Sequence, residues 1–532
     1  MGTGEALVQV DNLRVTFPGP VHAVRGISFS VARGECVAIV GESGSGKSVT
    51  ARTLVGLAGT TATVTADTLR LDGRDTAGFG DREWRRLRGR VAGLVLQDAL
   101  VSLDPLNTVG QEIGEVLRVH GIGTAGERTG RVTGLLEAVH VPGPAERARQ
   151  YPHQLSGGLR QRALIASAIA ADPPLLIADE PTTALDVTVQ AQLLRLLAER
   201  KAAGSTLLLV SHDLAVVAAI ADRVLVMHDG VIVEQGPTPE VLHAPQHEYT
   251  KLLLAAVPTA ASKGVRLSSL TREPLPPRAV EPDRVVLRAE GLRHHYGPRR
   301  VVDDVSFTLA RGETLGIVGE SGSGKTTVAR IALGLVEPEA GTVHLGDTRW
   351  SGVPERRRRA QRRGIQVIAQ DPLSSFDPRY TVEKLVAEPL DLRGSARRDR
   401  VVELLERVGL GPAHLRRHPR ELSGGQRQRV AIARAVGPRP DVLVCDEPVS
   451  ALDVSIQAQV LDLLADLQAA DGTALLFISH DLGVVHHLAD RVLVLHNGRV
   501  VERGAVGDVF TDPSDDYTKA LLAAVPRLEA AR

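Results

Sequence analysis

Two glycine-rich loops in the chain have the composition of polyphosphate-binding loops. GESGSGKS at residues 41–48 and GESGSGKT at residues 319–326 each follow an apolar run and precede a segment that favours a helix. A strand, a loop of the form GxxxxGK followed by Ser or Thr, and a helix surround phosphate oxygens with backbone N–H groups and a helix N-terminus. Lys47 and Lys325 would reach the outer phosphates, and the hydroxyls of Ser48 and Thr326 would face Mg²⁺. The sequence therefore predicts two nucleotide sites.

The candidate contacts extend over both loops and onto the residue that follows each of them. The expected nucleotide contacts are Gly41, Glu42, Ser43, Gly44, Ser45, Gly46, Lys47, Ser48 and Val49 in the first loop, and Gly319, Glu320, Ser321, Gly322, Ser323, Gly324, Lys325, Thr326 and Thr327 in the second. Two copies in matching contexts make a chance occurrence negligible.

Two acidic pairs could hold the metal and activate water. Asp179 and Asp446 each end an apolar run typical of a buried strand, where a carboxylate is costly unless it faces a cation. Glu180 and Glu447 come next. Side chains alternate along a strand, so these two should point to the other side, where a base could polarise water in line with a γ-phosphate. The alternative is a solvated Asp-Glu pair without a chemical role. We assign the aspartates to Mg²⁺ and the glutamates to catalysis.

Two histidines are further catalytic candidates. His212 and His480 follow the apolar runs TLLLVS and ALLFIS, at the edge of a parallel sheet where ligands collect. A single histidine is usually structural. Here the residue recurs 33 and 34 positions after the aspartate of the acidic strand, and this recurrence favours a catalytic role.

The chain is an internal repeat, and the repeat determines its architecture. The glycine loop, LSGGLRQR or LSGGQRQR, and LLIADEPTTALD or VLVCDEPVSALD follow one another in both halves. We therefore predict two homologous domains, at residues 1–258 and 285–532. A short, extended, Pro-rich linker at residues 259–284 would join them. In each half, strands alternate with helices, which is typical of a parallel sheet, and a helix-rich insertion runs from about residue 100 to residue 154 in the first.

Composition excludes several classes of protein. The 532 residues carry 63 Lys plus Arg and 63 Asp plus Glu, and a net charge of zero argues against a chain that coats nucleic acid. No run of 18 or more apolar residues exists, and the first residues lack the pattern of a signal peptide, so we expect a soluble chain. Cys36 and Cys445 lie in apolar runs, which predicts two buried thiols and no cysteine-built metal site.

The order of these motifs resembles the nucleotide-binding domains of ATP-binding cassette (ABC) transporters. The shared motifs are the glycine loop, LSGGxRQR, DEP, ALD and SHD, in both halves. LSGG is the most informative of them, because other glycine-loop proteins lack it. The implied fold class is α/β: two tandem P-loop (Walker A) domains of ABC type. Each would have a RecA-like, mostly parallel sheet core, an antiparallel β subdomain and an inserted helical subdomain.

The resemblance implies an intramolecular dimer of the two halves that buries two ATP molecules. Each ATP would lie between the glycine loop of one half and LSGG of the other, whose helix start can present N–H groups and a hydroxyl to an anion. The residues carried over for the LSGG motifs are Ser156, Gly157 and Gly158, and Ser423, Gly424 and Gly425. Gln97 and Gln370 would contact Mg²⁺, and Asp186 and Asp453 of the ALD motifs would contact the nucleotide. Because neither set lacks a member, we expect both sites to hydrolyse ATP.

The adenine would stack on an aromatic residue shortly before the strand that leads to each glycine loop. Phe17 in LRVTF and Tyr296 in LRHHY occupy matching places. Phe17 departs from the Tyr usual in the family and is followed by Pro18. For both aromatics the alternative is ordinary packing in the core.

The ends of both halves resemble the ATPases of dipeptide, oligopeptide and nickel importers. They read HAPQHEYTKLLLAAVP at residues 243–258 and TDPSDDYTKALLAAVP at residues 511–526. Some members carry a cysteine cluster near the C-terminus for an iron–sulfur centre. No Cys follows Cys445, so we expect ATP and Mg²⁺ as ligands and no iron–sulfur cluster. Physically, each tail could be an amphipathic helix that covers the edge of its own domain.

The expected function is an ATPase that powers an importer of peptides or a related small solute. The chain would bind two integral-membrane permease subunits at the cytoplasmic face of the membrane, as a peripheral protein. It would work indirectly with an extracytoplasmic solute-binding protein and have no nucleic-acid partner. One alternative is a soluble twin-cassette ATPase of translation or DNA repair, which shares the core motifs, and another is an exporter ATPase. The Pro-rich linker argues against the first, and the two tails argue against the second.

Overall fold

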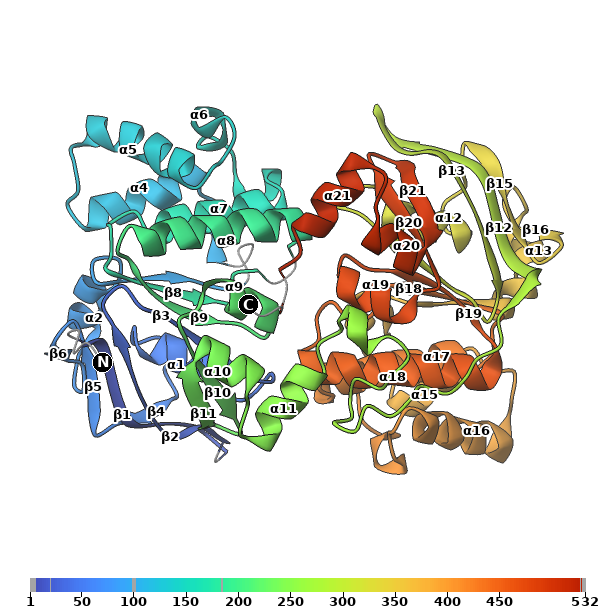
Figure 1. Ribbon diagram of the computed structural model, residues 1–532, viewed down its shortest axis with the longest axis horizontal. Coiled ribbons are helices and arrows are strands. Elements are labelled where there is room, and N and C mark those ends of the chain that lie inside the picture. Colours follow the sequence, from blue (N-terminus) through green and yellow to red (C-terminus); the bar gives the residue numbers. More distant parts are fainter. Residues whose placement is uncertain (1–5, 20, 98–101, 183–184, 527, 529–532) are drawn as a thin grey trace. The chain divides into compact units, whose positions relative to one another are not determined.

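The chain divides into two compact units, each of which contains one copy of the repeat (Figure 1). The computed structural model describes all residues except 1–5, 20, 98–101, 183–184, 527 and 529–532. Residues 1–185, 189–254 and 526–532 belong to the first unit, and residues 186–188 and 255–525 belong to the second.

An antiparallel sheet opens the first unit. Its strands are β1 (Ala6–Phe17), β2 (Val21–Ala32), β4 (Thr63–Thr65), β5 (Thr68–Leu71) and β6 (Arg74–Asp75). Along β1 every second residue is buried, first at Val8 and Val10 and then, after a bulge at Asn12, at Leu13 and Val15. This alternation is what a sheet with one face on the core requires. It matches the predicted antiparallel β subdomain.

A six-stranded sheet forms the centre of the first unit. Its order is β11-β10-β3-β9-β8-β7, and all neighbours are parallel except β10 and β11. The strands are β3 (Cys36–Val40), β7 (Ala92–Val95), β8 (Leu175–Asp179), β9 (Thr206–Val210), β10 (Arg223–His228) and β11 (Val231–Pro237). β3, β8 and β9 are buried along their whole lengths, as expected of strands covered on both faces. Because these strands are parallel, the loops after β3, β7, β8 and β9 meet at one edge.

Helices cover this sheet and form the predicted insertion. They are α1 (Lys47–Thr53), α2 (Asp81–Leu87), α4 (Val109–Val119), α5 (Ala125–Ala138), α6 (Pro144–Arg147), α7 (Gly157–Ala168), α8 (Val187–Ala202), α9 (Leu214–Ile220), α10 (Thr238–His243) and α11 (Glu248–Ala255). α4 and α5 pack on each other and on α7, which joins the insertion to the sheet (Figure 1). The predicted start of the insertion, near Leu100, lies outside the described residues.

The second unit repeats both sheets. The antiparallel sheet contains β12 (Glu281–Tyr296), β13 (Arg299–Arg311), β15 (Ala340–Leu345) and β16 (Thr348–Arg349). The core sheet has the order β17-β18-β19-β14-β20-β21. Its strands are β14 (Thr314–Val318), β17 (Ile365–Ile368), β18 (Val442–Asp446), β19 (Ala474–Ile478), β20 (Arg491–His496) and β21 (Arg499–Ala505). This order equals that of the first unit, so the predicted α/β class is confirmed in both halves.

The helices of the second unit follow the same plan. They are α12 (Lys325–Ala332), α13 (Glu355–Arg358), α14 (Pro372–Ser375), α15 (Val382–Ala387), α16 (Gly394–Arg407), α17 (Gly424–Val436), α18 (Val454–Asp471), α19 (Leu482–Leu488), α20 (Val506–Thr511) and α21 (Asp516–Ala523). Within the described ranges, no helix of either unit is long and apolar enough to cross a bilayer. Cys36 and Cys445 are buried and unbonded, as the sequence predicts.

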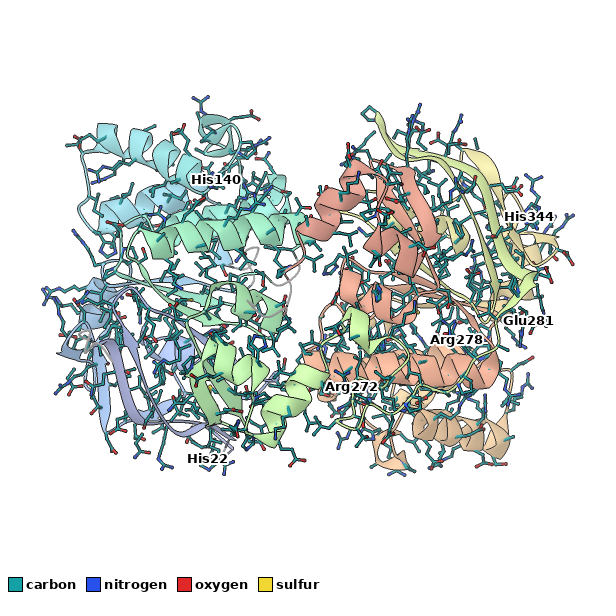
Figure 2. The ribbon with its side chains drawn as sticks, viewed as in Figure 1. His22, His140, Arg272, Arg278, Glu281 and His344 are labelled. Carbon is teal, nitrogen blue, oxygen red and sulfur yellow. The ribbon has the colours of Figure 1, made fainter. Side chains whose placement is uncertain are left out.

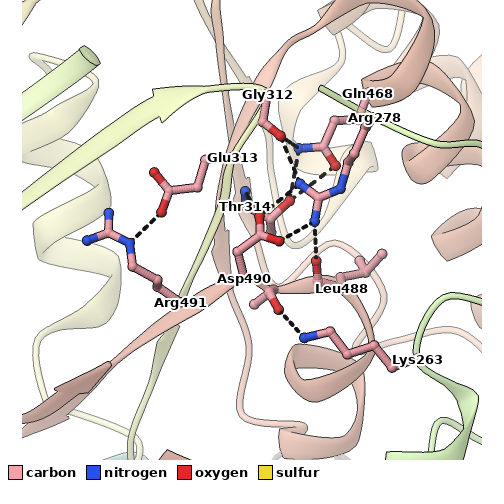
Figure 3. Close-up of polar contacts among 10 residues, drawn as sticks. Lys263, Arg278, Gly312, Glu313, Thr314, Gln468, Leu488, Asp490 and Arg491 are labelled. Atoms are coloured by element: carbon pink, nitrogen blue, oxygen red, sulfur yellow. Dashed lines mark hydrogen bonds and ion pairs between the residues drawn. The ribbon is translucent and has the colours of Figure 1, made fainter. Parts of the chain in front are cut away.

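The segment predicted to be an extended linker is in fact bound to the second unit. Arg278 donates two hydrogen bonds to the carboxylate of Asp490, at 2.8 and 2.6 Å, and Lys263 donates to the carbonyl of Ala489 at 2.8 Å (Figure 3). The backbone N–H of Leu267 donates to Asp462 at 3.0 Å. The segment is thus part of the second unit's surface.

The predicted boundary between linker and second domain also needs correction. β12 begins at Glu281, which is labelled with Arg278 in Figure 2, so residues 281–284 belong to the sheet. Low periodicity and Pro residues gave no sign of a strand here. The residues that anchor its start are far away in the chain, so the local sequence could not indicate them.

Candidate nucleotide site

Glycine is required where each loop leaves its strand and where it enters its helix. Gly41 and Gly319 both have φ of 146°, and a Cβ on Gly41 would lie 2.1 Å from the carbonyl oxygen of Met227. At the helix start, Gly46 has φ of 98°, and its Cβ would lie 2.4 Å from the carbonyl oxygen of Ala23. Any other residue would push the loop outward. The remaining predicted loop residues lie between these two positions or in the first turn of α1 or α12.

The lysine of each loop turns back over the loop. Lys47 Nζ donates to the carbonyls of Gly41 and Glu42 at 2.7 and 2.8 Å. Lys325 Nζ makes the same two bonds to Gly319 and Glu320, also at 2.7 and 2.8 Å. Both side chains are buried, and burial is the main cause that lowers the pKa of Lys325. A buried ammonium at the mouth of a loop of N–H groups favours an anionic ligand.

The loop hydroxyls fit a phosphate and a divalent cation. Ser48 Oγ donates to Asp179 Oδ1 at 2.7 Å, and Thr326 Oγ1 to Asp446 Oδ1 at 3.4 Å. Burial raises the pKa of both aspartates, which is the cost that a facing cation would remove. Ser45 Oγ and Ser323 Oγ are buried without a hydrogen-bond partner among the described residues, which leaves a donor in each loop for a ligand. Hydroxyl and carboxylate oxygens are the ligands that Mg²⁺ prefers.

Each catalytic candidate glutamate contacts a glutamine and a histidine. Gln97 Nε2 donates to Glu180 Oε2 at 2.8 Å, and His212 Nδ1 lies 3.3 Å from the same oxygen. In the second unit Gln370 Nε2 donates to Glu447 at 2.9 Å, and His480 Nδ1 lies 3.3 Å from that carboxylate. The structure therefore brings Gln, Glu and His together in each unit, next to the Asp of the preceding position.

A backbone turn, and not the strand pleat, separates each aspartate from its glutamate. β8 and β18 end at the aspartates, and Glu180 and Glu447 have φ of 49° and 50°. This left-handed conformation is uncommon outside glycine and is typical of functional sites. The two carboxylates have different partners, Ser48 and Arg52 for Asp179 and Gln97 and His212 for Glu180, and strand alternation is not the cause.

The glutamates affect the pKa of the two histidines. Burial alone would lower the pKa of His212 and His480. The hydrogen bond and the charge of Glu180 or Glu447 outweigh that burial, so each histidine pKa is raised above its ordinary value. The same pair lowers the pKa of Glu447 against the upward effect of its burial. In the second unit both shifts favour an imidazolium paired with a carboxylate.

The LSGG serines begin helices. Ser156 caps α7 and accepts from the N–H of Leu159 at 3.4 Å, and Ser423 caps α17 and accepts from Gln426 at 3.2 Å. The last position of LSGG needs glycine, because a Cβ on Gly158 would lie 2.6 Å from Val189. Gly157 and Gly424 are the first residues of these helices. Backbone N–H groups at an exposed helix start are suited to an anion.

The remaining candidates divide into exposed and packed residues. Tyr296 ends β12 with 48% of its surface exposed, and its ring lies edge-to-face with that of His294 at 4.8 Å between centroids. Phe17 ends β1 but packs partly against the hydrophobic core of the first unit, so the core-packing alternative describes part of its role. Asp453 caps α18 by accepting from Ile456 at 3.1 Å, and Asp186 directly precedes α8.

Sequence reasoning missed two kinds of site residue. Arg52 in α1 lies 3.3 Å from Asp179, and Tyr249 in α11 accepts a hydrogen bond from the loop N–H of Glu42 at 3.0 Å. Both have a counterpart in the other half, Arg330 and Tyr517. Comparison of the halves residue by residue, beyond the known motifs, is the signal that could have found them.

Comparisons with known proteins agree with this geometry. The family described as ABC transporter matches residues 24–183 and 302–450. The family described as the oligopeptide/dipeptide transporter C-terminal region matches residues 233–281 and 501–532. The glutathione import ATP-binding protein GsiA of Shigella dysenteriae serotype 1 is 44% identical over 99% of this chain and 90% of its own length. The oligopeptide transport ATP-binding protein OppD of Mycobacterium bovis is 42% identical over 99% of both chains.

Proposed function

The chain belongs to the ABC transporter family, and from this premise we propose that it powers the import of peptides or of a peptide-like solute such as glutathione. The predictions of the family, of the fold and of an ATPase coupled to transport are confirmed. The observation that carries the choice of importer is the tail. Both halves end in a segment that matches the oligopeptide/dipeptide transporter region, whereas the core motifs are shared by the whole family.

The residues of each unit supply the parts that phosphoryl transfer needs. The loop N–H groups and Lys47 or Lys325 hold the phosphates. Ser48 with Asp179, and Thr326 with Asp446, would hold Mg²⁺, which neutralises charge on the phosphate oxygens. Glu180 and Glu447 would accept a proton from the attacking water, and His212 and His480 would keep those carboxylates ionised and oriented.

Each half is complete, so we propose that both sites turn over. ATP would be enclosed between the glycine loop of one half and the LSGG serine of the other, within one chain. Closure on ATP would act on two permease subunits at the cytoplasmic face of the membrane. A solute-binding protein on the other side would deliver the cargo to those permeases.

Capture of the ATP-bound state tests this function. The Glu180→Gln, Glu447→Gln chain should bind ATP without hydrolysing it, and it should remain with its partners during purification in mild detergent. We expect mass spectrometry of the captured complex to identify two multi-spanning permeases. Recovery of ribosomal or DNA-repair proteins without permeases would overturn the importer and leave the ATP sites intact.

A further inference from the structure

The tail of each half reaches the glycine loop through one tyrosine. Tyr249 in α11 accepts a hydrogen bond from the backbone N–H of Glu42, and Tyr517 in α21 accepts one from that of Glu320, both at 3.0 Å. The two tyrosines lie in the tails and far from the loops in sequence. The motifs of the ATP site contain neither of them.

The N–H that donates to each tyrosine belongs to a peptide group whose carbonyl accepts a hydrogen bond from the loop lysine. The peptide between Gly41 and Glu42 has its carbonyl on Lys47 Nζ at 2.7 Å and its N–H on Tyr249. In the second unit the peptide between Gly319 and Glu320 is held between Lys325 and Tyr517 in the same way. A trans peptide is planar, so its C=O and N–H point in opposite directions. A hydrogen bond that fixes the N–H therefore also orients the C=O.

Each tyrosine is itself held in place by a ring contact. Its ring stacks on the histidine that ends the neighbouring strand: His228 of β10 lies 4.0 Å from Tyr249, and His496 of β20 lies 3.9 Å from Tyr517, between ring centroids. Burial raises the pKa of Tyr517 to about 12, so its hydroxyl stays neutral at physiological pH.

A carboxylate fixes the start of each tail helix. Glu234 of β11 accepts from the N–H groups of Gln246 and His247, at 2.7 and 3.0 Å. Glu502 of β21 accepts from those of Ser514 and Asp515, at 2.7 and 3.2 Å. The residues just before the tyrosines differ, HAPQHE in one half and TDPSDD in the other, yet the contacts are the same. The arrangement therefore does not depend on those preceding side chains.

We propose that Tyr249 and Tyr517 are positioning residues that orient the Gly–Glu peptide of the glycine loop and, through its carbonyl, the phosphate-binding lysine. This inference rests on the proposed function, because it concerns ATP on these two loops. It assigns a role in ATP binding to the tail that distinguishes the importer branch. Loss of the hydroxyl frees the peptide to rotate and takes the lysine away from its bound geometry.

Each tyrosine is tested in a chain with only one working loop. The variant Lys325→Ala inactivates the second loop, and Tyr249→Phe is then tested in the first. The variant Lys47→Ala inactivates the first loop, and Tyr517→Phe is then tested in the second. The affinity for a non-hydrolysable ATP analogue with Mg²⁺ is measured by calorimetry. We expect a three- to tenfold loss of affinity, about the value of one net hydrogen bond. Hydrogen exchange in residues 41–48 or 319–326 should become faster in the affected loop alone.

The controls separate this role from general destabilisation. Tyr380→Phe removes a hydroxyl from a partly buried ring that packs against the second unit's core, and it should change neither affinity nor loop exchange. An unchanged affinity in Tyr249→Phe and Tyr517→Phe would overturn the inference, as would a higher affinity, which would mean that the hydroxyl competes with phosphate. If the parent chains with one working loop do not bind the analogue, the proposed ATP sites are wrong, whatever the tyrosines do.

Discussion

Asp179 of the first unit is fully buried, with Arg52 3.3 Å away and Ser48 2.7 Å away. Its counterpart Asp446 is partly exposed and has its hydroxyl partner, Thr326, at 3.4 Å. Among the described residues no arginine forms an ion pair with Asp446, and Arg330 acts on it only at longer range. The glutamate, glutamine and histidine have nearly the same distances in both units.

The two units thus share the contacts of the glutamate and differ in those of the aspartate. The Gln–Glu–His contacts agree to within 0.1 Å between the units. The distance between the aspartate and an arginine differs between the units, although both halves have an arginine at this position, Arg52 and Arg330. Identical motifs can therefore differ in how strongly each site depends on a neighbour outside the motif.

The largest effect should come from the glutamates, and it tests the similarity of the two sites. Glu180→Gln with Glu447→Gln should lower ATP turnover by about 10²- to 10⁴-fold, because the general base is lost in both sites. The two single variants should lower phosphate release to the same extent, within about twofold. A full rate in one single variant and none in the other would show that one site is inactive.

The arginines test the difference. Arg52→Ala leaves Asp179 buried without its cation, so we expect about a tenfold fall in ATPase rate at pH 7. Burial raises the pKa of Asp179 and Arg52 opposes that rise, so in this variant the rate should partly recover as the pH increases. Arg330→Ala should lower the rate by about twofold or less, since no close ion pair is lost. Equal losses in steady-state assays would contradict the comparison.

A smaller effect is expected on the melting temperature, because Asp222 and its counterpart Asp490 are paired with different cations. Asp222 accepts from Lys201 of α8 at 2.7 Å, whereas Asp490 accepts from Arg278 of the bound linker. Arg278→Ala should lower the melting temperature of the second unit by about 4 °C, because a charged bidentate pair is worth about 1–2 kcal/mol there. Lys201→Ala should cost the first unit less, since the Asp222 side chain is 47% exposed. Pulse proteolysis with mass spectrometry assigns each transition to its unit.

The smallest effect should appear in acid. Burial lowers the pKa of His487, which contacts Ser262 of the linker at 3.1 Å and lies near Asp462, Lys263 and His486. The unfolded chain then binds a proton below about pH 6.5 that the folded unit resists. The second unit should lose stability as the pH falls through that range.

The first unit serves as the internal control for this effect, because it has Ala219 at the corresponding position. His487→Ala should make the second unit's free energy of unfolding in urea change less between pH 7.5 and pH 5.5, while His486, whose pKa burial also lowers, keeps part of that change. An unchanged pH dependence in this variant would assign the acid sensitivity to another group.

Sequence patterns were sufficient for the parts that are local. The loop, the Asp–Glu pair and the histidine each follow a buried apolar strand, and parallel strands bring their ends together. The alternation of strands and helices predicted the parallel core sheet, although it did not give the order of the strands. These features depend on a few neighbouring residues, so the motif and its structure coincide.

The contacts that sequence reasoning missed join distant segments. Nothing around Arg278 indicates that it binds Asp490, because the pair is 212 residues apart. Only alignment of the halves gives a hint: Lys201 corresponds to Gln468, so the second unit lacks the lysine that serves Asp222. The conformation of Glu180 depends on a turn whose backbone angle has no composition signal.

Because Arg278 lies in the linker and binds the second unit, it decides where the gene could be divided into two. A break after residue 258 would give the second protein every cation that its Asp490 needs. A break after residue 284, at the boundary expected from composition, would leave the arginine on the wrong product and remove the first residues of β12. Two-gene versions of such a chain that start their second product with its proline-rich leader should therefore be more stable than those that start at the strand.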